Sequence, residues 1–292
     1  MSFLDDVVEA FPDLQEVKPL GVVSGQKDVF RARLGEKAVV LKVVKPSKDE
    51  ELSEGRLERE VAAVASLRSD FVPTVHRQGK RTVGGQERVF LIEDLVEGTS
   101  LREALIDRRF SGDEVLDMVH ALLLACRDFE QQKLVHRDIK PENLILDPDG
   151  KLWVIDFGLV RFLEQESLTA TSAHFGPFTP GYGAPEQMRN RKQEIDVRAD
   201  LFAVGIVAHE LFTGANHHWR DRNPLSAMRS VENTALPRLK VPGDRDGKLA
   251  ELIASLASRY ITRRPLNAVE ALEWFTEVRA QMNIDHGNPE EA

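Results

Sequence analysis

The sequence predicts an α+β fold of two lobes, a small β-rich lobe with one helix followed by a larger helical lobe. Strand-forming residues gather in short runs between Val17 and Leu95, and glycine turns separate neighbouring runs. After Gly98, apolar residues recur mainly at helical spacing. The pattern changes near residues 95–99, where we expect the lobes to join. A cleft at such a joint is a common place for a small ligand to bind.

The domain boundaries follow from this change of pattern. We assign residues 1–16 to an N-terminal extension, 17–95 to the first lobe, 96–282 to the second lobe and 283–292 to a flexible tail. A chain of 292 residues has ample core for independent folding. Its 42% hydrophobic and 30% charged residues are ordinary for a globular protein.

The first lobe is expected to form antiparallel hairpins, because turn residues occur at Gly35-Glu36-Lys37 and at Gly84-Gly85. The predicted strands cover Leu20–Val23, Val29–Leu34, Ala38–Val44 and Arg88–Leu95. One helix, over Glu51–Leu67, interrupts them, and its apolar residues share one face.

Three helices are predicted in the second lobe. The first covers Asp113–Gln132, and the second covers Arg198–Thr213 and ends at Gly214, a typical C-terminal stop. The third follows Pro265, and its apolar stripe consists of Val269, Leu272, Phe275 and Val278.

Charge and cysteine usage argue against several classes of protein. The net charge of −9 and the pI near 5.5 argue against nucleic acid or an anionic membrane as the main partner. Cys126 is the only cysteine, so no intramolecular disulfide can form and a reducing compartment is indicated. No apolar run approaches the roughly 18 residues of a membrane helix, and Asp5 and Asp6 are unlike the basic start of a signal peptide. We therefore expect a cytoplasmic protein.

The most informative segment runs from His136 to Asn143 and reads His-Arg-Asp-Ile-Lys-Pro-Glu-Asn. It brings a carboxylate (Asp138), an ammonium (Lys140) and an amide (Asn143) together, and an Asp-Phe-Gly sequence follows at Asp156. Phosphoryl transfer needs such groups, because metal and cations neutralise phosphate charge while one carboxylate orients the acceptor hydroxyl.

These segments resemble the catalytic and metal-binding segments of Hanks-type serine/threonine protein kinases, which have a bilobal protein-kinase fold. The resemblance implies a kinase, bacterial in style, that transfers the ATP γ-phosphate to protein Ser and Thr hydroxyls and also phosphorylates itself. It implies Asp138 as the catalytic carboxylate and Lys140 as the side chain that steadies the transferring phosphoryl group. Asn143 and Asp156 would hold Mg²⁺, with Mn²⁺ as an alternative.

The resemblance also implies ATP-binding residues in the first lobe. Lys42, a lone cation in an apolar strand, matches the lysine that contacts the α- and β-phosphates. Its expected partner is Glu60, whereas the competitor Glu58 would point about 200° away around the helix. The glycine-rich loop is eroded, and of its glycines Gly25 is the one securely retained before Val29. Backbone N–H groups of this loop can still bind phosphate, so ATP binding is expected. Whether the loop encloses the phosphates tightly stays an open question.

An ungapped match to the family places the unusual Glu93 at the gatekeeper position. Asp94 and Val96 would then supply the backbone contacts of the hinge. The gatekeeper identity rests on that match alone.

The stretch from Thr179 to Glu186 resembles the segment that ends a kinase activation loop and receives the substrate peptide. In the family, the carboxylate of this segment pairs with an arginine before the last helix, which implies a Glu186–Arg264 pair. Asp200 resembles the helix residue that braces the catalytic loop. We expect these residues to have structural roles.

A hydroxyl-rich stretch lies between Gly158 and Thr179 and contains Ser167, Thr169, Thr171 and Ser172. The resemblance implies that Thr169 and Thr171 are regulatory phosphosites. It also implies a phosphate pocket formed by Arg137 and Arg161, since a phosphate can order a loop on paired guanidinium groups.

Two rival functions stay open. A pseudokinase that acts as a nucleotide sensor or scaffold is favoured by the eroded glycine loop and opposed by the intact Lys42 and Asp138. A small-molecule phosphotransferase is opposed by the Ala-Pro-Glu sequence that ends at Glu186. The sequence does not indicate the protein substrate, the pathway or the oligomeric state.

Overall fold

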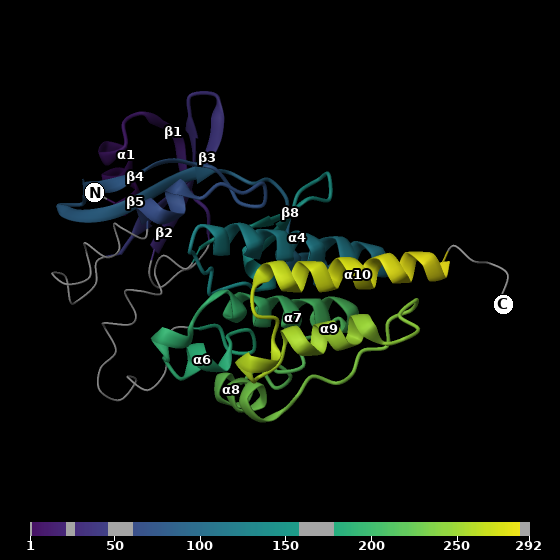
Figure 1. Cartoon of the computed structure of the whole chain (residues 1–292). Helices are drawn as coiled ribbons and strands as arrows, with labels where there is room; N and C mark the ends of the chain where they lie inside the picture. The colour runs from purple at the N-terminus through teal and green to yellow at the C-terminus, as the bar shows by residue number, and fades with distance from the viewer. Residues whose placement is uncertain (1, 22–26, 46–60, 158–177, 287–292) are drawn as a thin grey trace. The chain divides into compact units, whose positions relative to one another are not determined.

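The computed structural model describes residues 2–21, 27–45, 61–157 and 178–286. These residues form two compact units, each built on its own elements (Figure 1). The first unit contains the described residues up to Glu97 together with Phe157, and the second contains the rest. A sheet dominates the first unit and helices dominate the second, which confirms the predicted α+β class.

An antiparallel five-stranded sheet in the order β1-β2-β3-β5-β4 forms the first unit. Its strands are β1 (Leu14–Pro19), β2 (Lys27–Leu34), β3 (Lys37–Val44), β4 (Val75–Val83) and β5 (Gln86–Asp94). The predicted hairpin turns are present between β2 and β3 and between β4 and β5. Gly84 and Gly85 form the second turn with φ angles of +59° and +77°, a conformation that suits glycine.

The structure differs from the expected strands in two places. β4 was not predicted, because its polar sequence His-Arg-Gln-Gly-Lys-Arg-Thr lacks the apolar residues that mark a strand. β1 ends at Pro19, so the strand expected from Leu20 does not start there: Leu20 and Gly21 are not in strand conformation. Val22 and Val23 lie outside the described residues, as does most of the helix expected over residues 51–67, of which 61–66 are described and helical.

Helix α1 (Phe3–Ala10) covers one face of the sheet. It begins with a capping box in which Ser2 and Asp5 each accept a backbone hydrogen bond from the other. The buried core on this face combines residues of the helix, of the segment after it and of the strands, namely Val7, Phe11, Leu14, Phe30, Ala32, Val39, Leu41, Val43, Val83, Phe90 and Ile92. Residues 1–16 therefore pack into the first unit.

The opposite face of the sheet carries Lys42. Side chains alternate along a strand, so Lys42 points away from the core that Leu41 and Val43 enter. On this second face, Val61 of the helix packs with Leu91 of β5. The lysine is thus placed beside a small apolar cluster rather than in open water.

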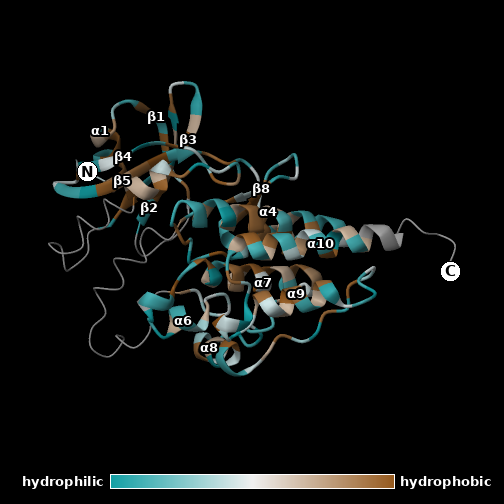
Figure 2. Ribbon diagram, viewed as in Figure 1, coloured by the Kyte–Doolittle hydropathy of each residue, from teal (hydrophilic) through white to brown (hydrophobic). Residues whose placement is uncertain are grey.

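Helix α7 (Val197–Thr213) is the centre of the second unit. It is buried from Ala199 to Leu211, and Figure 2 colours much of it brown, as expected for a helix inside a core. Helices α4 (Gly112–Gln131), α9 (Lys248–Leu256) and α10 (Ala268–His286) pack around it. The three predicted helices of this part correspond to α4, α7 and α10. Among the described residues, none of the helices combines the length and apolar composition needed to cross a membrane.

Shorter elements complete the second unit. They are α3 (Leu101–Asp107), α6 (Pro185–Met188), α8 (Pro224–Asn233) and the 3₁₀ turns η1 (Pro141–Asn143), η2 (Lys192–Glu194) and η3 (Ile261–Arg263). A small antiparallel sheet consists of β6 (Thr99–Ser100), β7 (Leu144–Leu146) and β8 (Leu152–Val154). Because β7 follows Asn143 and β8 ends just before Asp156, this sheet positions both segments of the candidate site.

Candidate active site

Asp138 is the centre of polar contacts in the loop between α4 and β7. Its Oδ2 accepts a hydrogen bond from Asn143 Nδ2 at 3.1 Å and lies 3.0 Å from Lys140 Nζ. Asn143 Nδ2 also donates to the backbone carbonyl of Asp138 at 2.9 Å. Three of the residues predicted for catalysis and metal binding therefore lie together in one loop.

Thr179 brings a hydroxyl into this cluster from the segment before α6. The hydroxyl donates to Asp138 Oδ1 at 2.6 Å and accepts a hydrogen bond from Lys140 Nζ at 3.0 Å. A carboxylate and an ammonium thus contact the same hydroxyl oxygen. This arrangement can orient an alcohol, accept its proton and balance negative charge beside it.

The carboxylate of Asp200, on α7, fixes the backbone of the loop. Its two oxygens accept hydrogen bonds from the N–H groups of His136 and Arg137, each at 2.7 Å. Arg137 has a φ of +66°, a left-handed conformation that costs a non-glycine residue roughly 1–2 kcal/mol. The two hydrogen bonds to the buried Asp200 carboxylate offset this cost. The geometry is the one that a bracing role for Asp200 requires.

His136 is fully buried, and its ring holds two backbone groups. Nε2 lies 3.1 Å from the carbonyl oxygen of Ile155, so this nitrogen carries the proton. Nδ1 then accepts a hydrogen bond from the N–H of Asp138 at 3.2 Å. The neutral ring connects the Asp138 loop to the segment that leads to Asp156.

Asn143 and Asp156 can supply oxygen ligands to a divalent cation. The N–H of Ile155 donates to the Asn143 carbonyl at 2.9 Å, which ties the two segments together. Because Asn143 turns Nδ2 toward Asp138, its Oδ1 is the amide atom that can bind a metal. Asp156 has a φ of +69°, an uncommon conformation of the kind found at functional sites. One carboxylate and one amide oxygen fit Mg²⁺, which takes few protein ligands and completes its shell with water and phosphate oxygens.

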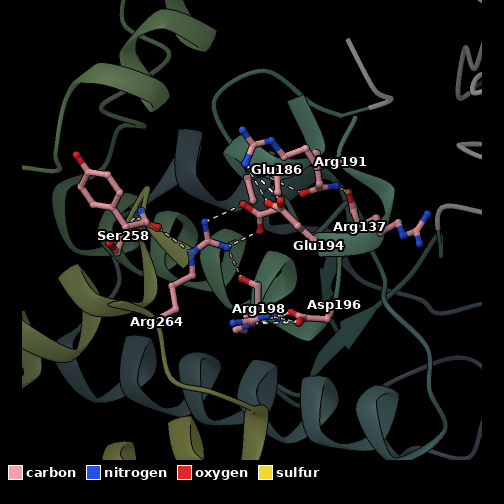
Figure 3. Close-up of polar contacts among 11 residues, drawn as sticks. Arg137, Glu186, Arg191, Glu194, Asp196, Arg198, Ser258 and Arg264 are labelled. Carbon is pink, nitrogen blue, oxygen red and sulfur yellow. Dashed lines mark hydrogen bonds and ion pairs between the residues drawn. The ribbon is translucent and has the colours of Figure 1, made fainter. Parts of the chain in front are cut away.

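Glu186 and Arg264 form the ion pair that the sequence implies, and both side chains are buried (Figure 3). The Arg264 guanidinium donates to the two carboxylate oxygens at 2.6 and 3.0 Å. It also donates to the carbonyls of Ser258 and Arg198 at 2.7 and 2.8 Å. These bonds connect α6, which follows the Thr179 segment, to α7 and to the chain before α10.

A second ionic network around Arg102 was not predicted. Arg102 donates to Glu142 at 2.8 Å, to Glu210 at 2.7 Å and to the Tyr182 hydroxyl oxygen, while the Tyr182 hydroxyl donates to Glu210. Burial, and next the Glu210 carboxylate, raise the pKa of Tyr182 well above its ordinary value, so the hydroxyl stays protonated. Through Glu142 and Tyr182, the network joins the loop that contains Asp138 to the segment that contains Thr179. Its members lie too far apart in sequence for a local pattern to indicate it.

In the first unit, Lys42 pairs with Glu93. Lys42 Nζ lies 2.6 Å from Glu93 Oε1, and the two side chains are only 7% and 9% exposed. The prediction named Glu60 as the partner of Lys42, and Glu60 lies outside the described residues. The signal for Glu93 was present in the sequence, because an acid that ends the apolar run Val89–Ile92 needs a partner if it is buried.

Three further residues predicted to bind nucleotide, Val29, Asp94 and Val96, lie in the described part of the chain. Val29 of β2 is directly opposite Lys42 in the sheet. The N–H of Asp94 donates to the carbonyl of Thr74 at 3.0 Å, and the Asp94 carboxylate lies 2.5 Å from His76 Nε2. Since its N–H already donates to Thr74, just before β4, a backbone contact from Asp94 to a ligand would come from its carbonyl. Val96 is half-buried beyond the end of β5.

Several predicted residues lie outside the described part of the chain. They are Gly25 of the glycine-poor loop, Glu60, Arg161 and the proposed phosphosites Thr169 and Thr171, with Ser167 and Ser172 beside them. Arg137, the other member of the predicted phosphate pocket, is described, and its backbone carbonyl accepts a hydrogen bond from Gln187 Nε2 at 2.9 Å.

Comparisons with known proteins agree with this geometry. The sequence profile of the protein kinase domain matches residues 22–274. The serine/threonine-protein kinase PknL of Mycobacterium tuberculosis is 37% identical over 160 residues, which are 54% of this chain and 38% of PknL. The probable serine/threonine-protein kinase pknA2 of Bifidobacterium longum is 30% identical over 232 residues, 79% of this chain and 30% of pknA2.

A third relative is similar over a longer stretch. The probable serine/threonine-protein kinase PknB of Lactococcus lactis is 24% identical over 271 residues, which are 91% of this chain and 42% of PknB. The chain thus spans less than half the length of each of these three proteins.

Proposed function

The chain belongs to the protein kinase domain family, with bacterial serine/threonine kinases among its relatives, and from this premise we propose that it transfers the γ-phosphate of ATP to serine and threonine hydroxyls of proteins. The observation that carries the proposal is the contact of Asp138 and Lys140 with one hydroxyl, that of Thr179. A site that phosphorylates an alcohol needs such a carboxylate and such a cation within hydrogen-bond distance of the acceptor.

The proposed roles follow from the chemistry of each side chain. Asp138 orients the acceptor hydroxyl and accepts its proton as the oxygen attacks phosphorus. Lys140, 3.0 Å from Asp138 Oδ2, balances the negative charge of the transferring group. Asn143 Oδ1 and the Asp156 carboxylate hold a divalent cation, which neutralises phosphate charge when bound. We propose Mg²⁺, with Mn²⁺ as an alternative, and Lys42 as a ligand of the nucleotide phosphates.

Further parts of the proposal rest on the sequence. They are autophosphorylation, control through Thr169 and Thr171 with Arg137 and Arg161, and a cytoplasmic location. Nothing in the comparisons favours a pseudokinase or a small-molecule phosphotransferase over a protein kinase.

The direct test is incubation of the purified protein with labelled ATP and Mg²⁺, with and without a generic protein substrate, followed by location of phosphosites by mass spectrometry. Phosphate should appear on Ser and Thr residues and should be lost in Asp138→Asn. The matched control is Asp149→Asn, because Asp149 is an exposed acid in the turn between β7 and β8. Transfer to Tyr alone, or transfer that survives Asp138→Asn, would contradict the proposal.

A further inference from the structure

A cavity of about 490 Å³ lies at the C-terminal end of α7, within the second unit. One wall consists of the end of α7 and the chain after it, within residues 209–220, and the other is the segment 237–240 between α8 and α9 (Figure 1). Cavities of this size can hold a small molecule. None of the described residues that line it was predicted to take part in catalysis or in ATP binding.

His209 of α7 joins the two walls. Its Nε2 lies 3.1 Å from the carbonyl oxygen of Pro237, so this nitrogen carries the proton and donates across the cavity. The side chain is only 4% exposed. Its Nδ1 is buried and has no hydrogen-bond partner among the described residues. A buried polar atom of this kind needs an explanation, and a ligand in the cavity that has a hydrogen-bond donor would provide one.

The cavity is positively charged. Arg220 lines the first wall, and Arg238 and Lys240 line the second. All three side chains are exposed, and in the part of the chain that the structure describes none of them forms an ion pair with a carboxylate. The described lining residues include no acid. Since cations on both walls lack a counter-ion from these residues, an anion is the complementary ligand.

Arg220 is held in place by His217, which also lines the cavity. Its Nη2 donates to His217 Nδ1 at 2.6 Å. Burial, and next the positive charge of Arg220, lower the pKa of His217, so the ring is neutral at pH 7 and its Nε2 carries the proton. A guanidinium has five N–H donors, and this contact uses one. Donors of Arg220 therefore remain for an anion.

The lining also has an apolar part, which Phe212 of α7 and Leu239 of the second wall provide. A ligand that fits both parts has an anionic group and an apolar body. Guanidinium groups match phosphate oxygens in geometry, and a phosphate monoester carries a charge of about −1.5 to −2 at pH 7, which suits several cations better than a single carboxylate does.

We propose that this cavity binds a small phosphate monoester with an apolar or aromatic body. Arg220, Arg238 and Lys240 contact the phosphate, and Phe212 and Leu239 contact the body. The P–OH group of the monoanion is a donor of the kind that a buried ring nitrogen needs. The inference goes beyond the proposed function, because binding here requires neither ATP nor phosphoryl transfer.

The test titrates phenyl phosphate into the purified protein without ATP or Mg²⁺ and follows the ring Cε1–H signals of His209 and His217 by NMR. Both signals should shift along a saturable curve with a Kd of about 1 mM or lower. Methyl phosphate has the same charge without the ring, and benzenesulfonate has the ring with a single charge. Each should bind at least about fivefold more weakly than phenyl phosphate.

Two variants remove charge from the two walls separately. Arg220→Gln changes the first wall, and the double variant Arg238→Gln/Lys240→Gln changes the second. Each should raise the Kd for phenyl phosphate about tenfold, as read from His209. The matched control is Lys133→Gln/Lys151→Gln, which removes two exposed cations from other surfaces of the same unit. Its Kd should stay within about twofold of that of the parent protein.

Three results would overturn the inference. They are the absence of a saturable shift at His209 and His217 with phenyl phosphate, an equal loss of affinity in the control variant, and binding of methyl phosphate as tight as that of phenyl phosphate. Because the measurement contains no nucleotide, a protein that failed to transfer phosphate would lose the proposed function and leave this comparison unaffected.

Discussion

Glu186 and Arg264, which lie 78 positions apart in the sequence, share a buried two-point ion pair that connects the start of α6 to the chain before α10 (Figure 3). The guanidinium also donates to two backbone carbonyls, so its donors are used on three different parts of the chain. Removing either partner should strongly destabilise the fold, because it leaves a buried charge without its counter-ion.

The first prediction concerns this pair. Glu186→Gln should lower the free energy of unfolding by about 3–5 kcal/mol, since Arg264 would keep its charge in a buried place. Glu194→Gln is the matched control, because Glu194 pairs with Arg191 at the surface with both side chains about half exposed; its loss should be below about 1 kcal/mol. Urea unfolding of both variants measures the difference. Equal losses would show that the Glu186 charge is not important for the fold.

The second prediction separates the two aspartates of the site. Asp138→Asn should abolish phosphotransfer but keep Mg²⁺-dependent ATP binding, because Asn143 and Asp156 are unchanged. Asp156→Asn should abolish transfer and also weaken the ATP binding that depends on Mg²⁺. Thermal shift measures binding, since a ligand at 100 times its dissociation constant stabilises the folded state by about 2.7 kcal/mol. Normal transfer by the Asp138 variant would refute its role.

The third prediction concerns Thr179. Thr179→Ala removes the hydroxyl that bridges Asp138 and Lys140, so it should lower kcat about tenfold or more. Thr179→Ser keeps the hydroxyl and should retain most of the activity. Steady-state kinetics at saturating ATP distinguish the two variants. If serine and alanine were equally impaired, the methyl group of Thr179 rather than its hydroxyl would matter.

The parts of the site that could be predicted from the sequence are those whose chemically suited residues lie close together along the chain. Asp138, Lys140 and Asn143 lie within one short segment, so their residue types alone indicate that they meet. The buried Glu93 could be expected to need a partner, but its contact with Lys42 could not be identified in this way, because that contact depends on which strands are neighbours and in what register. The same holds for Arg102, whose partners come from distant segments.

The elements of the fold that were predicted also differ physically from those that were missed. Helices α4 and α10 carry apolar residues at helical spacing, α7 is apolar over most of its length, and all three were predicted. β4 was missed because most of its residues are polar and only partly buried. Pairing with β5 across the Gly84-Gly85 turn, rather than burial of its own side chains, makes this segment a strand.

The last prediction concerns acid stability and follows from His218. This side chain is buried, and its Nδ1 lies 2.8 Å from the Ser230 hydroxyl oxygen on α8. Burial, together with the neighbouring His217, His209 and Arg220, lowers the pKa of His218 from 6.5 to about 4. The folded protein therefore keeps the ring neutral over a pH range in which the unfolded chain binds a proton. The stabilisation is complete above pH 6.5 and is lost as the pH falls toward 4.

Between pH 7 and pH 5, this single group should reduce the free energy of unfolding by about 2 kcal/mol. His218→Gln cannot take up the proton, so its unfolding free energy should change less over the same interval, even if the variant is less stable at pH 7. The measurement is urea unfolding of both proteins at pH 7, 6 and 5, and the difference between the two curves isolates His218 from the other titrating groups. Parallel curves would show that His218 binds its proton equally well in the folded and unfolded states.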